Sequence, residues 1–366
     1  MDRICTIIAQ NYLPQAMILL DSVRRIYPKI EFYILVTDSK SDFSSLLPSA
    51  IVLKPEDLKI DQKWLSEMKS YYDTVELATS LKPFLLQSLL VEGISTVTFL
   101  DPDILLLNRL DLGINSARVT GVALTPHRIK PGTLAEINST DLSFLRYGVY
   151  NLGYICVGHA GKPMLSWWAS RLRWYCTRFP DDIVFTDQKW LDLAPAYFDV
   201  SIIKHPGYDL APWNISERSI YKNDSDFYTQ GHELVFIHFS QMSSSLAKGV
   251  DPGLWYKGAL DSEESLQIIK SLTEEYSSKL LAASKVVTQF SENIPRETPN
   301  VTWDSSYRKR LIRHSISREL NDKTHRKIRQ WRFKSNILLL LERSATFRGF
   351  LNGIKIDGKK FTQRFR

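Results

Sequence analysis

Two aspartates separated by a single proline, Asp101 and Asp103, follow an apolar run over residues 96–100. The β-branched and aromatic residues of that run predict a strand that is buried on both faces. Pro102 cannot donate a hydrogen bond to a sheet, so the strand must end at or beside it. Both carboxylates are therefore expected at the C-terminal edge of a parallel strand, which is where open α/β sheets bind their ligands.

These two carboxylates could hold a divalent cation, or they could belong to a simple turn. Carboxylate oxygens suit Mg²⁺ or Mn²⁺, and such an ion would neutralise the diphosphate of a bound nucleotide. In the alternative, the strand ends in a turn and Asp103 caps the segment that follows. The first strand-to-helix turn, AQNYLPQA, contains no glycine, which excludes a dinucleotide fingerprint and a P-loop.

Alternating strands and helices are expected to position these side chains. The apolar patterns predict strands at residues 4–9, 32–37, 96–100, 119–124, 150–157 and 234–239. They predict helices at residues 14–26, 81–90, 163–179 and 187–193, and one that begins at Asp261 with Glu264 completing a capping box. Residues 38–80 read as an irregular polar stretch, and residues 293–300 as a linker. The βαβ order indicates an α/β fold with a mainly parallel central sheet and helices on both faces.

Five short motifs occur in order along this framework: IIAQNY, FLDPDI, YNLGYICV, FTDQKW and VFIHFS. With them the chain resembles the GT-A glycosyltransferases, in particular the retaining family that includes bacterial lipopolysaccharide galactosyltransferases and glycogenin. The resemblance implies a Rossmann-like GT-A catalytic domain over residues 1–255, with a helical extension and linker at 256–300. It also implies a metal-dependent, retaining hexosyltransferase that uses a nucleotide sugar, in particular a UDP-sugar, and a bacterial surface-glycan acceptor.

The resemblance assigns a metal ion to Asp101, Asp103 and His238. Without it, a single histidine at the end of an apolar strand would be read as a structural residue. A set of two carboxylates and an imidazole favours Mn²⁺ slightly over Mg²⁺, because imidazole suits transition metals better.

By the same resemblance, the nucleotide sugar is expected to be held by Asn11, Lys82, Asp101, Asn151, Gly153 and Lys248. Lys82 is predicted at the start of a helix, where a cation opposes the helix dipole and a donor phosphate would relieve that cost. The alternative is a solvated lysine. Lys248 comes ten residues after His238 and could cover the leaving diphosphate. The glycine and Lys-Pro-Trp context usual in the family is missing around it.

Gln188 and Asp187 are the catalytic candidates. In the resembling family the glutamine lies beneath the anomeric carbon, and the neighbouring acid helps to position the sugar. A glutamine amide is a poor nucleophile, so front-side attack by the acceptor is favoured over a covalent intermediate. Gln188 would then orient or stabilise an oxocarbenium-like centre. Asp187 is also predicted to be the N-cap of the helix QKWLDL.

The segment PGYDLAPWNISER is denser in polar and aromatic residues than a plain connector needs. Trp213, Asn214, Glu217 and Arg218 could shape an acceptor pocket, because aromatic faces pack well on the CH-rich faces of sugars. Equally, Glu217 and Arg218 could form a structural ion pair.

The net charge of +7 conceals two oppositely charged parts. Residues 305–366 contain 18 Lys or Arg and 4 Asp or Glu, a balance of +14, whereas the preceding residues have a balance of −7. Such a basic segment on an acidic body predicts an anionic surface as partner.

A basic amphipathic segment is expected over residues 301–366. Its apolar residues near one helical stripe are Ile328, Trp331, Leu338 and Leu341. This pattern favours binding to an anionic membrane surface. Charge alone also permits nucleic-acid binding, but the apolar content and the acidic body argue against that partner. In a third interpretation the stripe packs on the body as a helical cap.

The cysteines Cys5, Cys156 and Cys176 are far apart in apolar surroundings, which indicates reduced core residues. The sequence shows neither a signal peptide nor the ~18 apolar residues of a membrane span. A cytoplasmic protein, peripheral at the inner face of the plasma membrane, is expected. Two rivals remain open: a sugar-nucleotide pyrophosphorylase-like nucleotidyltransferase, which should carry a Gly-rich basic loop after the first strand, and a nucleic-acid-binding protein acting through the basic tail.

Overall fold

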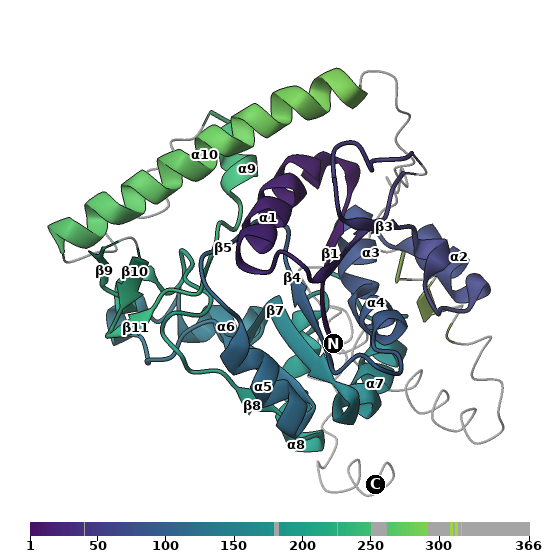
Figure 1. The fold of residues 1–366 in the computed structure, drawn as a ribbon. Helices are drawn as coiled ribbons and strands as arrows, with labels where there is room; N and C mark the ends of the chain where they lie inside the picture. The colour runs from purple at the N-terminus through teal and green to yellow at the C-terminus, as the bar shows by residue number, and fades with distance from the viewer. Residues whose placement is uncertain are drawn as a thin grey trace, which may run out of the picture. The chain divides into compact units, whose positions relative to one another are not determined.

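The computed structural model describes residues 1–39, 41–178, 183–224, 226–249 and 262–291, with residues 308–309, 312–313 and 316. Two compact units divide the chain, Met1–Trp303 and Asp304–Arg366. The helices and strands named below all belong to the first unit (Figure 1). The apolar stripe of the predicted amphipathic helix and the predicted linker at 293–300 lie outside the described residues.

A seven-stranded sheet forms the centre of the first unit, in the order β3-β2-β1-β4-β7-β6-β8. Its strands are β1 (Asp2–Ile8), β2 (Glu31–Val36), β3 (Ile51–Leu53), β4 (Thr96–Leu100), β6 (Val122–Pro126), β7 (Tyr150–Gly158) and β8 (Ser201–Ile202). Four of the six neighbouring pairs are parallel, and β7 alone runs against its neighbours. The predicted α/β fold with a mainly parallel sheet is confirmed. Because β1, β4 and β6 point the same way, their C-terminal ends meet at one edge.

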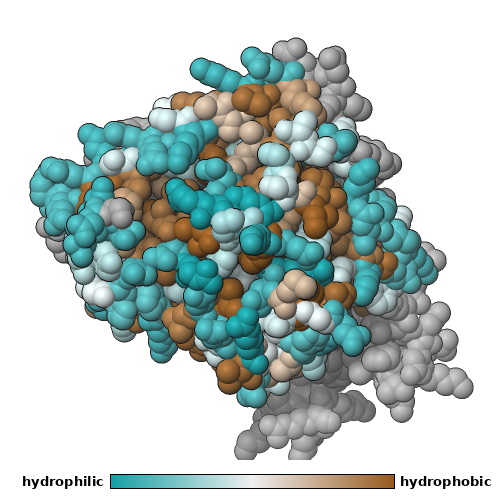
Figure 2. Space-filling view, viewed as in Figure 1, coloured by the Kyte–Doolittle hydropathy of each residue, from teal (hydrophilic) through white to brown (hydrophobic). Residues whose placement is uncertain are grey.

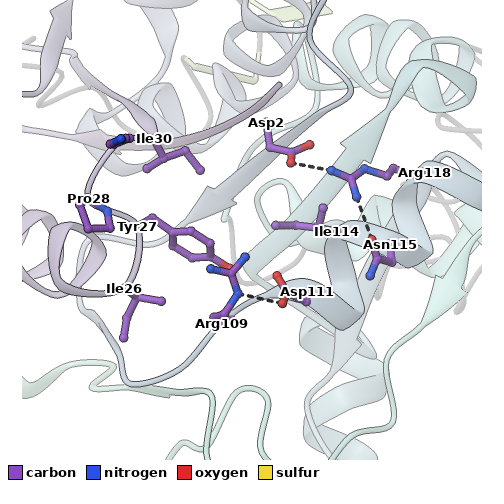
Figure 3. Close-up of a pocket in the computed structure, with 11 residues that line it drawn as sticks. Asp2, Ile26, Tyr27, Pro28, Ile30, Arg109, Asp111, Ile114, Asn115 and Arg118 are labelled. Atoms are coloured by element: carbon purple, nitrogen blue, oxygen red, sulfur yellow. Dashed lines mark hydrogen bonds and ion pairs between the residues drawn. The ribbon is translucent and has the colours of Figure 1, made fainter.

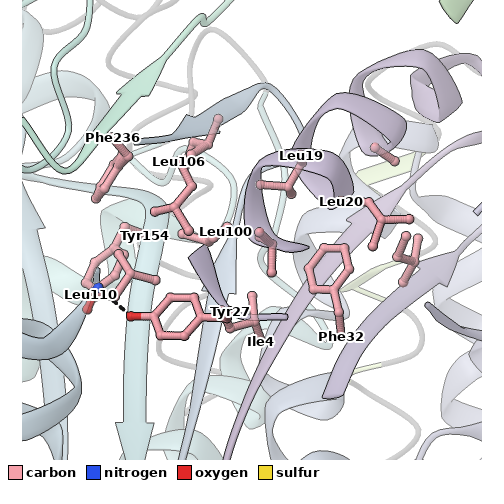
Figure 4. Packing of buried hydrophobic residues seen from close by; sticks show 14 of the residues in the cluster. Ile4, Leu19, Leu20, Tyr27, Phe32, Leu100, Leu106, Leu110, Tyr154 and Phe236 are labelled. Carbon is pink, nitrogen blue, oxygen red and sulfur yellow. Dashed lines mark hydrogen bonds between the residues drawn. The ribbon is translucent and has the colours of Figure 1, made fainter. Parts of the chain in front are cut away.

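Helices cover both faces of this sheet. On one face, α1 (Leu13–Ile26) and α5 (Asp111–Thr120) share a buried core with Ile4, Phe32, Leu100 and Tyr154 (Figure 4). Phe99 points to the other face, because successive strand residues alternate in direction. There α4 (Lys82–Leu89) packs on β4, α3 (Thr74–Ser80) packs on β1, and α7 (Lys162–Leu172) packs on α4. The remaining helices are α2 (Gln62–Tyr71), α6 (Asp141–Tyr147), α8 (Ala194–Tyr197), α9 (Met242–Ala247) and α10 (Glu263–Ser291).

A two-stranded ribbon outside the main sheet matters most for the site. β5 (Ile104–Leu106) pairs antiparallel with β12 (Phe236–His238), and the register places His238 opposite Ile104. Since Asp103 directly precedes Ile104, the ribbon brings the histidine to the Asp101–Asp103 turn. A separate three-stranded sheet consists of β9 (Ile220–Asn223), β10 (Asp226–Thr229) and β11 (His232–Glu233).

The long helix α10 packs against the β5–β12 ribbon. It packs against α1 and β9, and its buried residues Leu272, Tyr276 and Leu280 share a core with Phe239. The Tyr276 ring stacks on Phe239 with 4.0 Å between the ring centroids. Asp261, the predicted start of this helix, lies outside the described residues.

Two predicted boundaries are wrong: one strand begins later than expected, and one helix ends earlier. The strand predicted at 119–124 begins at Val122, because α5 continues to Thr120 and ends at Gly121, whose φ is 93°. The helix predicted at 163–179 stops at Leu172. Its last carbonyls there accept hydrogen bonds from tyrosine hydroxyls, including Tyr72 to Leu172 at 2.6 Å.

Two further expectations fail in the secondary structure. The supposedly irregular stretch at 38–80 contains α2 and α3, whose N-cap residues Asp61 and Asp73 each accept two backbone N–H groups. The helix predicted at 187–193 is a 3₁₀ helix, η5 (Gln188–Leu193). In both cases the segment is short, so the spacing of its apolar residues is a weak guide to its secondary structure, and contacts with the rest of the protein decide it.

The predicted state of the cysteines is confirmed, since Cys5, Cys156 and Cys176 are buried and free. Burial raises the pKa of the Cys156 thiol to about 12. Within the part of the chain that the structure describes, no helix has both the length and the hydropathy needed to cross a bilayer. On the face seen in Figure 2, hydrophobic residues lie in separate patches among hydrophilic ones.

Candidate active site

The turn after β4 and the end of β12 bring two carboxylates and one imidazole together. His238 Nε2 lies 3.1 Å from Asp103 Oδ1 and 3.9 Å from Asp101 Oδ2. One ligand atom from each of the three residues lies within 4.8 Å of the others. The aspartate side chains keep 29% and 15% of their surface exposed, whereas that of His238 keeps 4%. The cluster therefore opens to solvent on its carboxylate side.

The chemistry of this cluster fits a divalent cation. Burial raises the pKa of Asp101, and the neighbouring carboxylates of Asp103 and Asp187 act in the same direction, although Lys82 and His238 oppose them. Burial alone would lower the pKa of His238, but the carboxylates of Asp103 and Asp209 outweigh it and hold that pKa well above the ordinary value. Closely spaced carboxylates and an imidazole form a donor set that suits Mn²⁺, with Mg²⁺ the second choice.

Strand β7 passes beside the cluster and leaves no room for a side chain at Gly153. A Cβ atom there would lie 2.5 Å from His238 Cε1. The Gly153 carbonyl accepts a hydrogen bond from Asp101 N at 2.8 Å, and its own N–H donates to Asn151 Oδ1 at 2.9 Å. Asn151 is buried. Through these hydrogen bonds, the motif Asn-Leu-Gly fixes the backbone beside the histidine ring.

Lys82 is a buried cation that joins the metal candidates to the catalytic candidates. Its Nζ lies 3.3 Å from Asp101 Oδ1 and 3.0 Å from Asp187 Oδ2, and it donates to Leu152 O at 2.8 Å. Burial would lower the pKa of Lys82, but Asp101 and Asp187 outweigh burial and raise it. The solvated-lysine alternative is wrong, because only 4% of this residue is exposed. Its contact with a donor phosphate stays a prediction.

Asp187 is buried, and its carboxylate does not cap the helix that follows. No side-chain capping bond forms at the start of η5, because the carboxylate turns inward to Lys82. The Asp187 carbonyl accepts a hydrogen bond from Trp168 Nε1 at 3.0 Å, which fixes the backbone. Gln188 follows directly, half-buried, and its Nε2 donates to Tyr147 O at 2.9 Å.

The remaining donor-side candidates, Asn11 and Lys248, are exposed and lie at different elements. Asn11 lines a cavity of about 420 Å³ together with Tyr12 of η1 (Gln10–Tyr12), Ser243 of α9 and Leu280 of α10. Burial raises the pKa of Tyr12, and Asp103 and Asp101 raise it further. Lys248 ends α9, and the chain immediately beyond Gly249 lies outside the described residues.

The acceptor candidates separate into two groups. Glu217 and Arg218 form a buried ion pair with 3.3 Å between Arg218 Nε and Glu217 Oε1, as the structural interpretation predicted. Asn214 is fully buried: its Nδ2 donates to His127 O and Asp209 O, and its Oδ1 accepts from Ala211 N. Trp213 is half-buried, and its ring makes a T-shaped contact with the His238 ring at a centroid distance of 5.3 Å.

Two residues that the sequence interpretation missed also lie in this site. His127 follows β6 at the same sheet edge as Asp101, donates from Nδ1 to Val149 O at 3.1 Å and faces Asn151 with Nε2. Burial lowers its pKa, which favours the neutral ring. Its place after a strand is a signal that could have identified it. Asp209 lies 3.5 Å from His238 Nδ1, and no pattern in the sequence indicates it.

A second cavity, of about 590 Å³, lies at the opposite edge of the sheet, where β1 begins (Figure 3). Its arginines are already paired: Arg118 with Asp2 at 2.6 Å, and Arg109 with Asp111 at 2.8 Å. No predicted site residue lines it.

No protein-family model matches the chain. It is 21% identical to YfnD, an uncharacterized protein of Bacillus subtilis (strain 168), over 272 residues that cover 72% of this chain and 85% of the relative. Similar solved structures include an active-site mutant of LgtC (11% identity, 84% of this chain and 99% of that chain, TM-score 0.43). They also include the glycosyltransferase GlyE of Streptococcus pneumoniae TIGR4 (12% identity, 81% and 66%, TM-score 0.39). The predicted similarity to glycosyltransferases is thus found among solved structures. Because the identities are low and the TM-scores lie below 0.5, the function of this chain has to be argued from its own site.

Replacing Lys82 with methionine tests whether this buried cation holds the site together. The variant leaves Asp101 and Asp187 without their shared partner, so the free energy of unfolding is expected to fall by about 3–5 kcal/mol. Urea denaturation followed by circular dichroism measures it. Lys69→Met is the matched control, because Lys69 pairs with Glu56 at the surface and should contribute less than about 1 kcal/mol. Equal small losses in the two variants would contradict the role given to Lys82.

Proposed function

We propose that the chain is a metal-dependent glycosyltransferase that moves a hexose from a nucleotide sugar to a glycan or glycolipid acceptor. The observation that carries this proposal is the convergence of Asp101, Asp103 and His238 at the C-terminal sheet edge, with Gln188 reached through Lys82 and Asp187. A UDP-sugar is the proposed donor, and a bacterial surface glycan the proposed acceptor.

Asp101, Asp103 and His238 would hold the metal ion, Mn²⁺ in preference to Mg²⁺. When bound, the ion supplies Lewis-acid stabilisation of the departing diphosphate. The two aspartates retain exposed surface, whereas His238 is buried, which leaves room for phosphate oxygens at the carboxylates. Asn11, Asn151, Gly153 and Lys248 are proposed to complete the donor site, with Lys248 covering the diphosphate from the end of α9.

Gln188 is proposed to lie under the anomeric carbon, with Asp187 positioning the sugar. The Asp187 carboxylate is 3% exposed and paired with Lys82, so it suits the role of a fixed anchor better than that of a nucleophile. A glutamine amide is also a poor nucleophile. Both features support front-side attack by the acceptor with retention of configuration, and Gln188 would stabilise the oxocarbenium-like centre through its amide dipole.

Trp213 is the proposed acceptor-side residue of this site. Its half-buried indole stands against His238, and the face of an indole packs well on the CH groups of a sugar. The sugar-nucleotide pyrophosphorylase alternative gains no support, because the turn between β1 and α1 carries no Gly-rich basic loop.

Removing the carboxylate of Asp103 tests the metal centre. Asp103→Ala is expected to lose Mn²⁺-dependent UDP binding in calorimetry, because the diphosphate would lose its counter-charge. Transfer should fall about a thousandfold or more, which corresponds to several kcal/mol of Lewis-acid stabilisation. Asp199→Ala, at an exposed aspartate, is the control and should behave as wild type. The metal assignment is wrong if Asp103→Ala retains Mn²⁺-dependent UDP binding.

Replacing Gln188 with alanine separates catalysis from binding. Turnover of the UDP-sugar is expected to fall about a hundredfold, because the lost dipole acts only on the transition state. Affinity for the nucleotide should stay within about twofold in the same calorimetric assay. Gln62→Ala, in the exposed first turn of α2, is the control. Parallel losses of affinity and turnover would make Gln188 an ordinary binding residue.

The basic segment over residues 301–366 is proposed to hold the protein at the inner face of the plasma membrane. The full chain should sediment with anionic phosphatidylserine vesicles but not with neutral phosphatidylcholine vesicles. It should be released near 1 M salt, where the screening length shortens to about 3 Å. A chain that ends at Trp303 keeps every candidate site residue and should lose sedimentation. If both chains sediment equally, the segment is not the anchor.

A further inference from the structure

Asp209 is a completely buried carboxylate whose two oxygens have no hydrogen-bond partner among the described residues. Burying a charged carboxylate is unfavourable unless a nearby charge or hydrogen bond compensates it. A residue in this position therefore needs an explanation that the packing of the core does not give.

A nitrogen of the His238 ring lies within ion-pair distance of this carboxylate. Asp209 Oδ1 lies 3.5 Å from Nδ1, and Nδ1 is itself buried without a hydrogen bond. The other nitrogen, Nε2, faces Asp103 at 3.1 Å. The imidazole ring thus separates Asp209 from the proposed metal ligands, and Asp209 lies on the wrong side of the ring to bind the ion itself.

The backbone around Asp209 is held in an uncommon conformation. Its φ is 57°, in the left-handed region that few residues other than glycine adopt. Asn214 Nδ2 donates to Asp209 O at 2.7 Å and to His127 O at 2.8 Å, which ties the turn to the end of β6. His238 N donates to Leu210 O at 2.8 Å, which ties the same turn to β12. The carboxylate is therefore fixed relative to the ring by its own backbone.

Packing fixes the ring from two other sides. Trp213 meets it edge-on at 5.3 Å and 88° between the ring planes. Gly153 leaves room for the His238 ring, because a Cβ atom at this position would lie only 2.7 Å from Nδ1. In this orientation the ring presents Nε2 to Asp103.

We propose that Asp209 is the positioning residue for His238: it accepts a hydrogen bond from Nδ1–H and thereby leaves Nε2 unprotonated as a metal ligand. A histidine ligand commonly donates its second ring nitrogen to a carboxylate, which fixes the tautomer and strengthens the ligand. This inference rests on the metal-binding role in the proposed function and adds a residue that no motif indicates.

The variant Asp209→Asn keeps the size of the side chain and removes its charge. Titration with Mn²⁺, with the free ion measured by electron paramagnetic resonance, should show affinity reduced about 10- to 100-fold. Its free energy of unfolding without metal is measured alongside, because Asp209 also pairs with the buried His238 ring. Asp226→Asn, at an exposed aspartate of β10, is the control and should bind Mn²⁺ as wild type does.

Three results would overturn the inference, and they are distinguishable. If Asp209→Asn binds Mn²⁺ within twofold of wild type while Asp103→Ala does not bind it, the metal site stands and the role of Asp209 falls. If Asp209→Asn is less stable without metal and its Mn²⁺ affinity is unchanged in the folded fraction, the residue is structural. If wild type itself binds no Mn²⁺, the proposed metal role and this inference fall together.

A second measurement needs no variant. In the wild-type chain with Zn²⁺ as a diamagnetic substitute, long-range ¹H–¹⁵N correlations of the His238 ring should show the Nδ1–H tautomer. The Nε2–H tautomer would overturn the proposal.

Discussion

Negative charge gathered at one edge of the sheet is the constraint on which the rest of this site depends. The carboxylates of Asp101, Asp103, Asp187 and Asp209 each lie within 4 Å of the Lys82 ammonium group or of a nitrogen of the His238 ring. Charges removed from water are stable only where opposite charges and hydrogen bonds are held in place. A divalent ion at Asp101 and Asp103 would offset most of the remaining negative charge. The same arrangement would attract an anionic diphosphate once that ion is bound.

The site has two connected parts, and each holds some of these carboxylates. Lys82, at the start of α4, links Asp101, a proposed metal ligand, to Asp187, which is proposed to position the sugar, and Trp168 holds the Asp187 backbone. On the other half, the β5–β12 ribbon fixes His238. A change at one carboxylate is therefore expected to reach the other half through Lys82, because both pairs share its single ammonium group.

Part of this site could be predicted from the sequence, because strand ends are visible there. Asp101 and Asp103 follow an apolar strand with a proline between them. His238 ends another strand, but only the resemblance to a known family joined it to the two aspartates. The capping role given to Asp187 was wrong, because a buried lysine from another helix takes its carboxylate. Asp209 could not be found, since its only signal is a tertiary contact with a ring 29 residues later in the chain. Similarly, α2 and α3 are fixed by their caps and packing rather than by a long apolar period.

The most direct test of the metal centre is a crystal of the chain grown with Mn²⁺ and UDP, with diffraction data collected at the manganese absorption edge. The account predicts one strong anomalous peak between Asp101, Asp103 and His238 Nε2, with the diphosphate on its solvent side. The account would be contradicted by UDP bound at this edge with no peak among the three residues, or by a peak that lies elsewhere in the molecule.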